Sequence, residues 1–294
     1  MKVLLFGANG QVGKDCAQAL VTAGYGLVSS SRADTDFSDS AAVFSKVIDE
    51  APGLVINACA YTAVDKAEDE KALANKVNHL SPQALAQSCA ELSIPLLQLS
   101  TDYVFDGQGD KPYKENAKVS PLGVYGSTKL AGEKSVQESL PEHIILRTSW
   151  VFGEQGNNFV KTMLRLAEGR DELNVVNDQF GRPTYVGTIV DVILFFVEQY
   201  TQNKTLPWGT YHCSNQGAVS WFEFAEAIFA QAKEQGVLDK AMVVNPIPSS
   251  EFPTPAPRPA YSVLDTHKLE TLMKTPLPHW ELGLTTFLHT IKQH

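Results

Sequence analysis

The sequence predicts an α/β fold, in which a doubly wound parallel sheet is followed by a smaller C-terminal α/β lobe. Three observations predict it. Short apolar runs alternate with longer amphipathic runs over residues 1–180, a glycine-rich turn follows the first apolar run, and the pattern changes after about Arg182. Alternating strands and helices imply right-handed crossovers and a parallel sheet.

The apolar runs lack polar alternation, which is typical of strands covered on both faces. These predicted strands are 2–7, 25–31, 54–60, 94–100, 143–149 and 172–177. Amphipathic spacing predicts helices at 12–23, 39–50, 75–91, 127–138 and 159–168. We expect residues 1–180 to form a dinucleotide-binding domain and 181–294 to form mainly a binding lobe, with the chain crossing between them.

The C-terminal third contains predicted helices at 189–200, 220–232, 262–273 and 285–293, and a strand at 209–214. The proline-rich stretch 245–259 is either a linker or an ordered extended segment, because proline restricts the backbone to extended conformations. We expect it to lie over a binding cleft.

Charge and composition exclude several classes of partner. The 294-residue chain has a formal net charge of -9 and a pI near 5.3, which disfavours nucleic acid and anionic membranes as partners. No apolar run approaches membrane-spanning length. The four cysteines form no C-x-x-C pair and the histidines show no ligand spacing, so we predict a soluble cytoplasmic protein without a metal held by one chain.

The glycine-rich turn "FGANGQVG" places Gly7, Gly10 and Gly13 directly after the first predicted strand and into the first helix. Glycines in that setting permit a tight turn, close approach of a pyrophosphate and close helix–strand packing. The turn therefore predicts a Rossmann-like dinucleotide site, although a plain tight turn would look similar.

The end of the second predicted strand indicates which dinucleotide is bound. Ser31 and Arg32 stand where an NAD-selective site would place a carboxylate for the ribose 2′-hydroxyl. An arginine there favours a 2′-phosphate, so we predict NADPH over NADH, unless Arg32 points into water. Asp36 and Phe37 could border the adenine, and Asp39 could cap a helix.

Tyr125 and Lys129 are four residues apart, as are Tyr200 and Lys204. Residues at this spacing share a helix face, and a lysine cation can help a tyrosine, whose reference pKa is about 10, to act as an acid. Only the first pair follows a strand that ends in hydroxyl side chains, among them Thr101, at the edge where such sheets bind ligands. We therefore predict that Thr101, Tyr125 and Lys129 converge for reduction of a ketone.

Several motifs together resemble a known family. "GANGQVG", "STDYVFDG", "SPLGVYGSTKLAGE" and "RTSWVF" resemble the extended short-chain dehydrogenase/reductase superfamily. "NACAYTAVDKAE", "GNNFVKTMLRLA", "DQFGRPT" and "RPAYSVLDTHKL" are similar to the dTDP-4-dehydrorhamnose reductases within it.

The resemblance implies NADPH-dependent reduction of dTDP-4-dehydro-L-rhamnose, the last step of dTDP-L-rhamnose synthesis. Tyr125 would donate the proton, Lys129 would tune it and hold the nicotinamide ribose, and Thr101 would bind the 4-keto oxygen. Further cofactor contacts are implied at Gln11, Val12, Ala58, Cys59 and Ala60. Sugar-nucleotide contacts are implied at Thr62, Val64, Asp102, Tyr103, Trp150, Arg182 and Arg258.

Alternatives stay open at this stage. Trp150 could be a core residue, and Arg182 and Arg258, the candidate diphosphate partners, could be surface arginines. A 4-epimerase shares the tyrosine and lysine, a reductase for a different 4-keto sugar nucleotide shares the motifs, and similar folds serve as non-catalytic NADP-binding subunits. A 4,6-dehydratase is disfavoured because Asp102 is followed by Tyr103 rather than glutamate.

The resemblance also bears on assembly. Some relatives are dimers bridged by Mg²⁺; Asp15 could be one ligand, but the matching second position is Gly187, so both the metal and the choice between monomer and homodimer stay open.

Overall fold

The computed structural model describes residues 1–293 and contains a central parallel sheet. Within these residues the sheet has six strands in the order β10-β5-β4-β3-β1-β2, and every neighbouring pair is parallel. The strands are β1 (Lys2–Phe6), β2 (Gly26–Ser30), β3 (Leu54–Asn57), β4 (Leu96–Thr101), β5 (His143–Thr148) and β10 (Gly209–His212). The predicted fold class is confirmed.

The strand order reverses between β1 and β3, and the crevice at such a switch point is where open α/β sheets bind ligands. β1 leads into the glycine turn and β3 leads into the loop at residues 58–63. The carboxyl ends of these two strands therefore mark the expected cofactor site.

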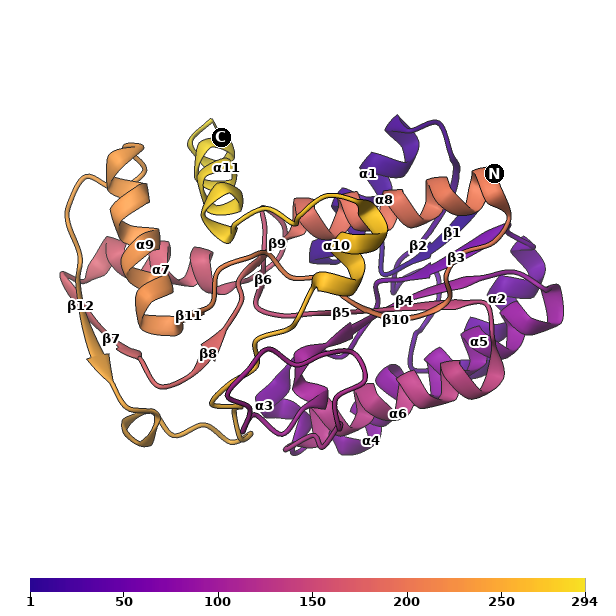
Figure 1. Cartoon of the computed structure of the whole chain (residues 1–294), viewed down its shortest axis with the longest axis horizontal. Coiled ribbons are helices and arrows are strands. Elements are labelled where there is room, and N and C mark those ends of the chain that lie inside the picture. Colours follow the sequence, from indigo (N-terminus) through magenta and orange to yellow (C-terminus); the bar gives the residue numbers. More distant parts are fainter. Residues whose placement is uncertain (294) are drawn as a thin grey trace.

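Helices cover both faces of the sheet (Figure 1). In β1, Val3 and Leu5 pack with α1 (Gln11–Thr22) and α8 (Val186–Asn203), whereas Leu4 and Phe6 pack on the opposite face with α2 (Ser40–Glu50), α5 (Ser81–Leu92) and α6 (Val124–Ser139). Alternate residues of a strand point to opposite faces, so a continuously apolar strand feeds two cores. Asp39 caps α2 by accepting from the backbone N–H groups of Ala41 and Ala42.

The helix predicted at 75–91 is interrupted. Two short helices, α3 (Val64–Ala67) and α4 (Lys71–Asn75), precede a π-helical turn, η1 (Lys76–Leu80), which runs into α5. The Asn78 side chain in η1 accepts from the Tyr61 N–H at 2.9 Å and donates to the Tyr61 carbonyl oxygen at 3.1 Å and to the Thr128 hydroxyl at 3.2 Å. Because π turns often occur at functional sites, this interruption ties the loop after β3 to α6.

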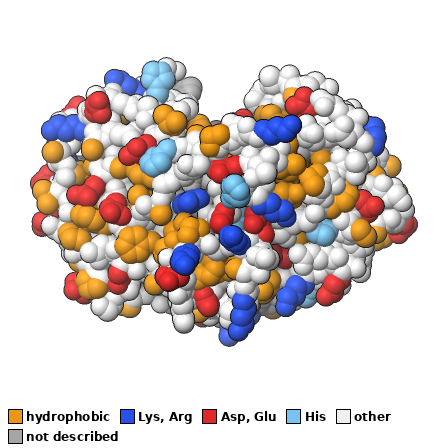
Figure 2. All heavy atoms as spheres, viewed as in Figure 1, with side chains coloured by type: hydrophobic (Ala, Val, Ile, Leu, Met, Phe, Trp, Pro, Cys, Tyr) orange, Lys and Arg blue, Asp and Glu red, His pale blue; other side chains and the backbone are white. Residues whose placement is uncertain are grey.

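A second lobe lies to one side of the sheet (Figure 1). Its core contains several aromatic side chains among aliphatic ones, and it is formed mainly by α7 (Phe159–Gly169), α9 (Trp221–Glu234) and α11 (Trp280–Lys292). Its paired strands are β7 (Glu172–Val176) with β12 (Val243–Ile247), β8 (Phe180–Gly181) with β11 (Val219–Ser220), and β6 (Val151–Phe152) with β9 (Thr184–Tyr185). Figure 2 shows a notch between the two lobes.

Two strands belong to a different lobe from the one that the predicted boundary at residue 180 would give them. The strand predicted at 172–177 is β7, but it pairs with β12 in the second lobe because Glu172 and Asn174 are exposed, a pattern unsuited to a doubly covered sheet. β10 adds the edge strand to the main sheet. The chain thus crosses between the lobes, and the domain boundaries themselves stay a prediction.

The proline-rich stretch 245–259 returns to the first lobe. It begins in β12, passes through the 3₁₀ turn η3 (Ser249–Glu251) and then runs extended. Asp65 of α3 accepts from the Ala256 N–H at 3.2 Å and from Arg258 at 2.8 Å. Extended backbone continues to residue 264, so the helix predicted at 262–273 begins only at α10 (His267–Met273).

Candidate active site

The glycine turn is closely packed against the loop after β3. Gly7 has φ +81°, and a Cβ there would lie 2.8 Å from the backbone of Ala58. A Cβ on Gly13 would lie 2.0 Å from the Gly7 carbonyl oxygen. Larger residues cannot occupy either position, as predicted for a turn that brings backbone N–H groups to a pyrophosphate.

Gln11 and Val12 form the first turn of α1, and no side chain caps that helix. Unpaired N–H groups at a helix N-terminus suit an anion. The predicted contacts of both residues with the cofactor stay predictions.

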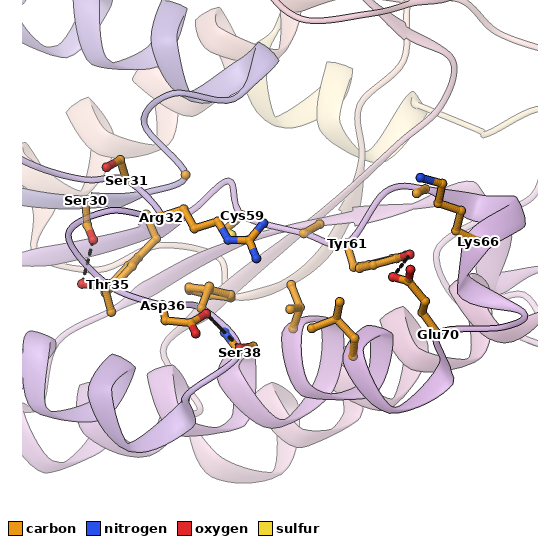
Figure 3. A pocket seen from close by; sticks show the side chains of 17 residues that line it. Ser30, Ser31, Arg32, Thr35, Asp36, Ser38, Cys59, Tyr61, Lys66 and Glu70 are labelled. Carbon is orange, nitrogen blue, oxygen red and sulfur yellow. Dashed lines mark hydrogen bonds between the residues drawn. The ribbon is translucent and has the colours of Figure 1, made fainter.

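Beside this turn is a cavity of about 350 Å³, seen in Figure 3. Its walls come from the end of β1, the turn after β2 and the loop after β3. They include the predicted cofactor residues Gly7, Ser31, Arg32, Asp36, Phe37, Cys59 and Ala60. The sequence predictions for the adenosine end of the cofactor therefore converge in space, although no ligand contact tests them.

Arg32 extends into the cavity (Figure 3). The neighbouring carboxylates have other partners: Asp36 accepts from the Ser38 hydroxyl at 2.8 Å, and Asp34 accepts from the Ser31 hydroxyl at 2.7 Å. These hydrogen bonds hold the pKa of both aspartates below the usual value. The Arg32 guanidinium is thereby left to face an anionic group such as a 2′-phosphate.

Tyr61, Lys66 and Glu70 are among the cavity residues that the sequence reasoning missed. Tyr61 donates its hydroxyl proton to Glu70 at 2.7 Å, and Lys66 lies at the end of the cavity opposite Ser31 (Figure 3). Their signal was the motif "NACAYTAVDKAE", which contains Tyr61 and Lys66 but does not show which of its side chains face the ligand.

Tyr125 is brought to the end of β4 by the way α6 begins. Glu68 accepts from the Val124 N–H at 2.8 Å, which anchors the helix N-terminus. A Cβ on Gly126 would lie 2.2 Å from the Tyr103 carbonyl oxygen, so only glycine lets α6 contact the 3₁₀ turn η2 (Asp102–Val104) this closely. This turn directly follows Thr101, so the predicted pair Thr101 and Tyr125 comes together.

The Tyr125 phenol lies against the Tyr103 ring, with centroids 5.4 Å apart and planes at 75°. Burial raises the pKa of Tyr125, a hydrogen bond with the Thr101 side chain opposes that rise, and nearby Asp102 adds to it. We expected Lys129 to lower this pKa, whereas burial raises it. A raised pKa keeps the phenol protonated at neutral pH, as a proton donor requires.

Lys129 lies one helical turn after Tyr125 and is buried. Its ammonium group donates to the Leu99 carbonyl oxygen of β4 at 2.8 Å. Burial lowers the pKa of Lys129 to about 8, and the nearby Glu133 carboxylate opposes this shift. The lysine therefore stays mainly protonated at neutral pH, next to the space where a cofactor ribose would lie.

Asp102 has an incompletely satisfied carboxylate. Its Oδ1 accepts from the Thr101 hydroxyl at 3.0 Å, but Oδ2 is buried without a partner, as is the Ser100 hydroxyl. Burial raises the pKa of Asp102 to about 6. Because buried polar atoms are nearly always hydrogen-bonded, a polar ligand or a water molecule is expected to complete this edge of the sheet, where the Ser262 side chain also opposes the rise in the pKa of Asp102.

Arg182 and Arg258 are partly buried rather than surface arginines. Arg258 pairs with Asp65 at 2.8 Å while its Nη1 is buried without a partner. Arg182 donates to the Thr266 hydroxyl at 3.4 Å, and its Nε is likewise buried and unpaired. Both arginines can therefore donate to further anionic oxygens, while their assignment to a diphosphate stays a prediction.

Trp150 has an unusual setting. Its φ is +47°, and its ring stacks on Trp221 with centroids 3.4 Å apart and planes at 6°. A Cβ on Gly181 would lie 2.4 Å from the ring. One face is therefore occupied by Trp221, so a sugar would have to meet the opposite face. Thr62 is exposed before α3, and Val64 begins that helix.

Two findings concern metal ligands and membrane-spanning helices. Among residues 1–293, no group of three or more His, Cys, Asp or Glu side chains is placed to hold a metal ion. Burial and nearby Glu154 raise the pKa of Asp15. Within the same residues, no helix combines the length and apolar character that crossing a membrane requires.

The fold and this arrangement define a member of the extended short-chain dehydrogenase/reductase superfamily: a Rossmann-like sheet carries the glycine turn, and a strand-end threonine meets a tyrosine and a lysine one helical turn apart. The chain belongs to the family described as RmlD substrate binding domain, whose model matches residues 1–293.

Individual relatives agree with this membership. The chain is 42% identical to the dTDP-4-dehydrorhamnose reductase of Salmonella typhimurium, covering 98% of this chain and 97% of that protein. Among solved structures, a dTDP-4-dehydrorhamnose reductase from Clostridium acetobutylicum is 37% identical with a TM-score of 0.92, covering 99% of this chain and 100% of that one. One from Bacillus anthracis, in complex with NADP, is 36% identical with a TM-score of 0.90, covering 98% and 99%.

Proposed function

We propose that this protein reduces the 4-keto group of dTDP-4-dehydro-β-L-rhamnose with NADPH, yielding dTDP-β-L-rhamnose. The observation that carries the proposal is the meeting of Thr101, Tyr125 and Lys129 at the carboxyl edge of the sheet, beside the glycine turn. The names of the relatives, which cover nearly the whole chain, support the choice of substrate.

The residues present fit NADPH. The turn at Gly7 and Gly13 leaves room for a pyrophosphate, and Arg32 offers a guanidinium for a 2′-phosphate. When bound, the cofactor supplies the hydride to C4 of the sugar. Everything else in the reaction is assigned to this chain's own side chains.

Tyr125 donates its phenolic proton to the oxygen on C4, so that hydride and proton together convert the ketone to a hydroxyl. Thr101, whose hydroxyl now donates to Asp102, would turn that donor toward the keto oxygen. Lys129 stabilises the phenolate that remains, because its cation lies on the same helix face.

The thymidine diphosphate is assigned to Arg182 and Arg258, whose unpaired nitrogens suit phosphate oxygens. The Asp102 carboxylate would take a sugar hydroxyl on its unpaired Oδ2. A cytoplasmic location stays a prediction of the sequence, and acceptance of NADH, a role for Mg²⁺ and the choice between monomer and homodimer stay open.

The test is to incubate the purified protein with NADPH and dTDP-4-dehydro-β-L-rhamnose, following NADPH absorbance and identifying the sugar by NMR. We expect one NADPH consumed per sugar reduced and dTDP-β-L-rhamnose as the product. A 4-epimerase would form a new sugar without net NADPH consumption, and a non-catalytic subunit would bind NADPH without oxidising it. Reduction to the opposite C4 configuration would identify a different sugar-nucleotide ketoreductase.

A further inference from the structure

On α6, a third ionisable residue, Glu133, lies on the same helix face as Tyr125 and Lys129. The three residues are successively four apart on α6, so they share one face of the helix. Glu133 is 2% exposed, which is rare for a carboxylate unless it is paired. The reaction proposed above gives it no part.

The partner of Glu133 is Arg147 on β5. Arg147 Nε donates to Glu133 Oε1 at 2.9 Å and Nη2 donates to Oε2 at 2.6 Å, a bidentate pair between two buried side chains. The guanidinium also lies over the Phe105 ring at 5.2 Å and donates to the Glu115 carbonyl oxygen at 3.4 Å. The carboxylate is therefore held in one orientation.

His212 of β10 is the third ionisable side chain in this buried network. Its Nε2 lies 3.5 Å from Arg147 Nη1, and burial, together with the Arg147 charge, lowers the pKa of His212 to about 3. The imidazole is neutral near neutral pH and adds no charge. The buried charges near this helix face are thus the Lys129 and Arg147 cations and the Glu133 anion between them.

Other ionisable groups facing Lys129 or α6 do not supply a second anion to that lysine. The Cys59 thiol, in the loop after β3, has its pKa raised to about 11 by burial and stays neutral. His79 of η1 contacts the Ser135 hydroxyl at 3.1 Å, and burial lowers its pKa. Glu68 of α3 binds the Val124 N–H, and Asp102 of η2 faces Thr101 and Tyr125.

We propose that Glu133 is a positioning residue whose carboxylate, oriented by Arg147, stabilises the protonated form of Lys129 and so sets the alkaline limit of the reaction. The kinetic part of this inference rests on the proposed function. The effect of Glu133 on the charge of Lys129 does not, because the ionisation of Lys129 can be observed without turnover.

The test compares Glu133→Gln, Arg147→Met and the double variant with the unaltered protein. In the pH profile of kcat/KM for NADPH-dependent reduction, we expect the alkaline pKa to fall by about one pH unit in Glu133→Gln, the lower end of the effect of a nearby opposite charge. The double variant also lacks the carboxylate, so its alkaline pKa should fall by a similar amount. Arg147→Met keeps the carboxylate but removes the group that orients it, so the fall should be smaller. A purely structural role predicts lower activity with an unmoved alkaline limb.

Each single variant leaves one buried charge unpaired and can fail to fold, whereas the double variant replaces the pair with neutral side chains of similar size. Circular dichroism and thermal melts establish which variants are folded. Titration of Lys129 by NMR on ¹³C-lysine-labelled protein then reads the same pKa without substrate. An unchanged Lys129 pKa in the folded double variant overturns the inference. An unaltered protein that does not oxidise NADPH overturns the proposed function instead.

Discussion

The two tyrosine–lysine pairs of this chain share a spacing and differ in everything around it. Tyr125 and Lys129 begin α6 against the end of β4, whereas Tyr200 and Lys204 end α8. Tyr200 packs near Trp208, with ring centroids 6.2 Å apart, and Lys204 caps the helix in the left-handed conformation with φ +57°. The spacing makes a shared helix face available, and the surroundings decide whether chemistry can use it.

The surroundings also differ in polarity. The first pair adjoins Thr101, the partly unpaired Asp102 carboxylate and the buried Glu133–Arg147 ion pair. The second pair adjoins an apolar core of α8 and β10 that includes Phe196 and Tyr211. Buried polar groups need partners, so only the first region has groups that a polar ligand would complete.

The largest expected effect comes from removing each lysine in turn. Lys129→Met should lower kcat for the proposed reduction by roughly 10²–10⁴-fold, the range for positioned acid–base groups, because the phenolate left on Tyr125 loses its cation. Lys204→Met should leave kcat within about twofold, because it removes an exposed charge that lies over the Tyr200 ring at 5.9 Å, away from the first pair. Steady-state NADPH oxidation measures both. Comparable losses of kcat in the two variants would contradict the assignment of catalysis to the first pair alone.

Arg32→Ala tests whether the Arg32 guanidinium binds the 2′-phosphate of NADPH in the cavity beside the glycine turn. The loss of a hydrogen bond to a charged group, about 1.5–3 kcal/mol, should lower kcat/KM for NADPH by roughly 10- to 100-fold. The value for NADH should change little, because NADH has no 2′-phosphate. Arg165→Ala, in the second lobe, serves as the control. An NADPH/NADH ratio unaffected by Arg32→Ala would place that guanidinium in solvent.

The buried network under the first pair should make the fold sensitive to acid. The pKa of His212 is about 3 in the folded protein, against about 6.5 in an unfolded chain. Between these values the unfolded chain binds a proton that the folded protein does not, so stability falls as pH falls from about 6.5 toward 3, by at most about 1.4 kcal/mol per pH unit. Asp102, whose pKa is raised to about 6, acts in the opposite direction between about 6 and 4.

Denaturant melts across this pH range check the assignment. His212→Gln should remove the loss of stability toward acid and leave the opposite slope from Asp102 between about pH 6 and 4, whereas His289→Gln, at an exposed position, should not change the curve. Parallel curves for the unaltered protein and His212→Gln would show that the acid sensitivity arises elsewhere.

The smallest effect is expected at the end of α8. Lys204→Gly places glycine at a left-handed cap and should raise the free energy of unfolding by up to about 1 kcal/mol, because glycine adopts this conformation without strain. NADPH oxidation should be unchanged. A variant that is stable but inactive would give the second pair a function after all.

Local patterns predicted much of the fold and site. The strand of four buried residues in β3 and the glycine turn follow from apolar continuity and from the few conformations open to a chain at Gly7. Thr101 and Tyr125 could be placed together because parallel strands share a ligand-binding edge.

Long-range packing could not be predicted from local sequence patterns. The pairing of β7 with β12, the π turn that seats Asn78 and the stacking of Trp150 on Trp221 each depend on segments far apart in the sequence. The pKa of Tyr125 was expected to fall because the lysine was visible in the sequence, whereas the burial that raises it was not.

The most direct test of the central claim, that position rather than spacing makes Tyr125 the acid, is a single-turnover comparison of Tyr125→Phe and Tyr200→Phe. Each protein would be preloaded with NADPH and mixed rapidly with dTDP-4-dehydro-β-L-rhamnose. We predict that Tyr125→Phe loses the NADPH oxidation phase while its NADPH affinity stays within a few-fold, and that Tyr200→Phe matches the unaltered protein. Equal rates in the two variants would contradict the account.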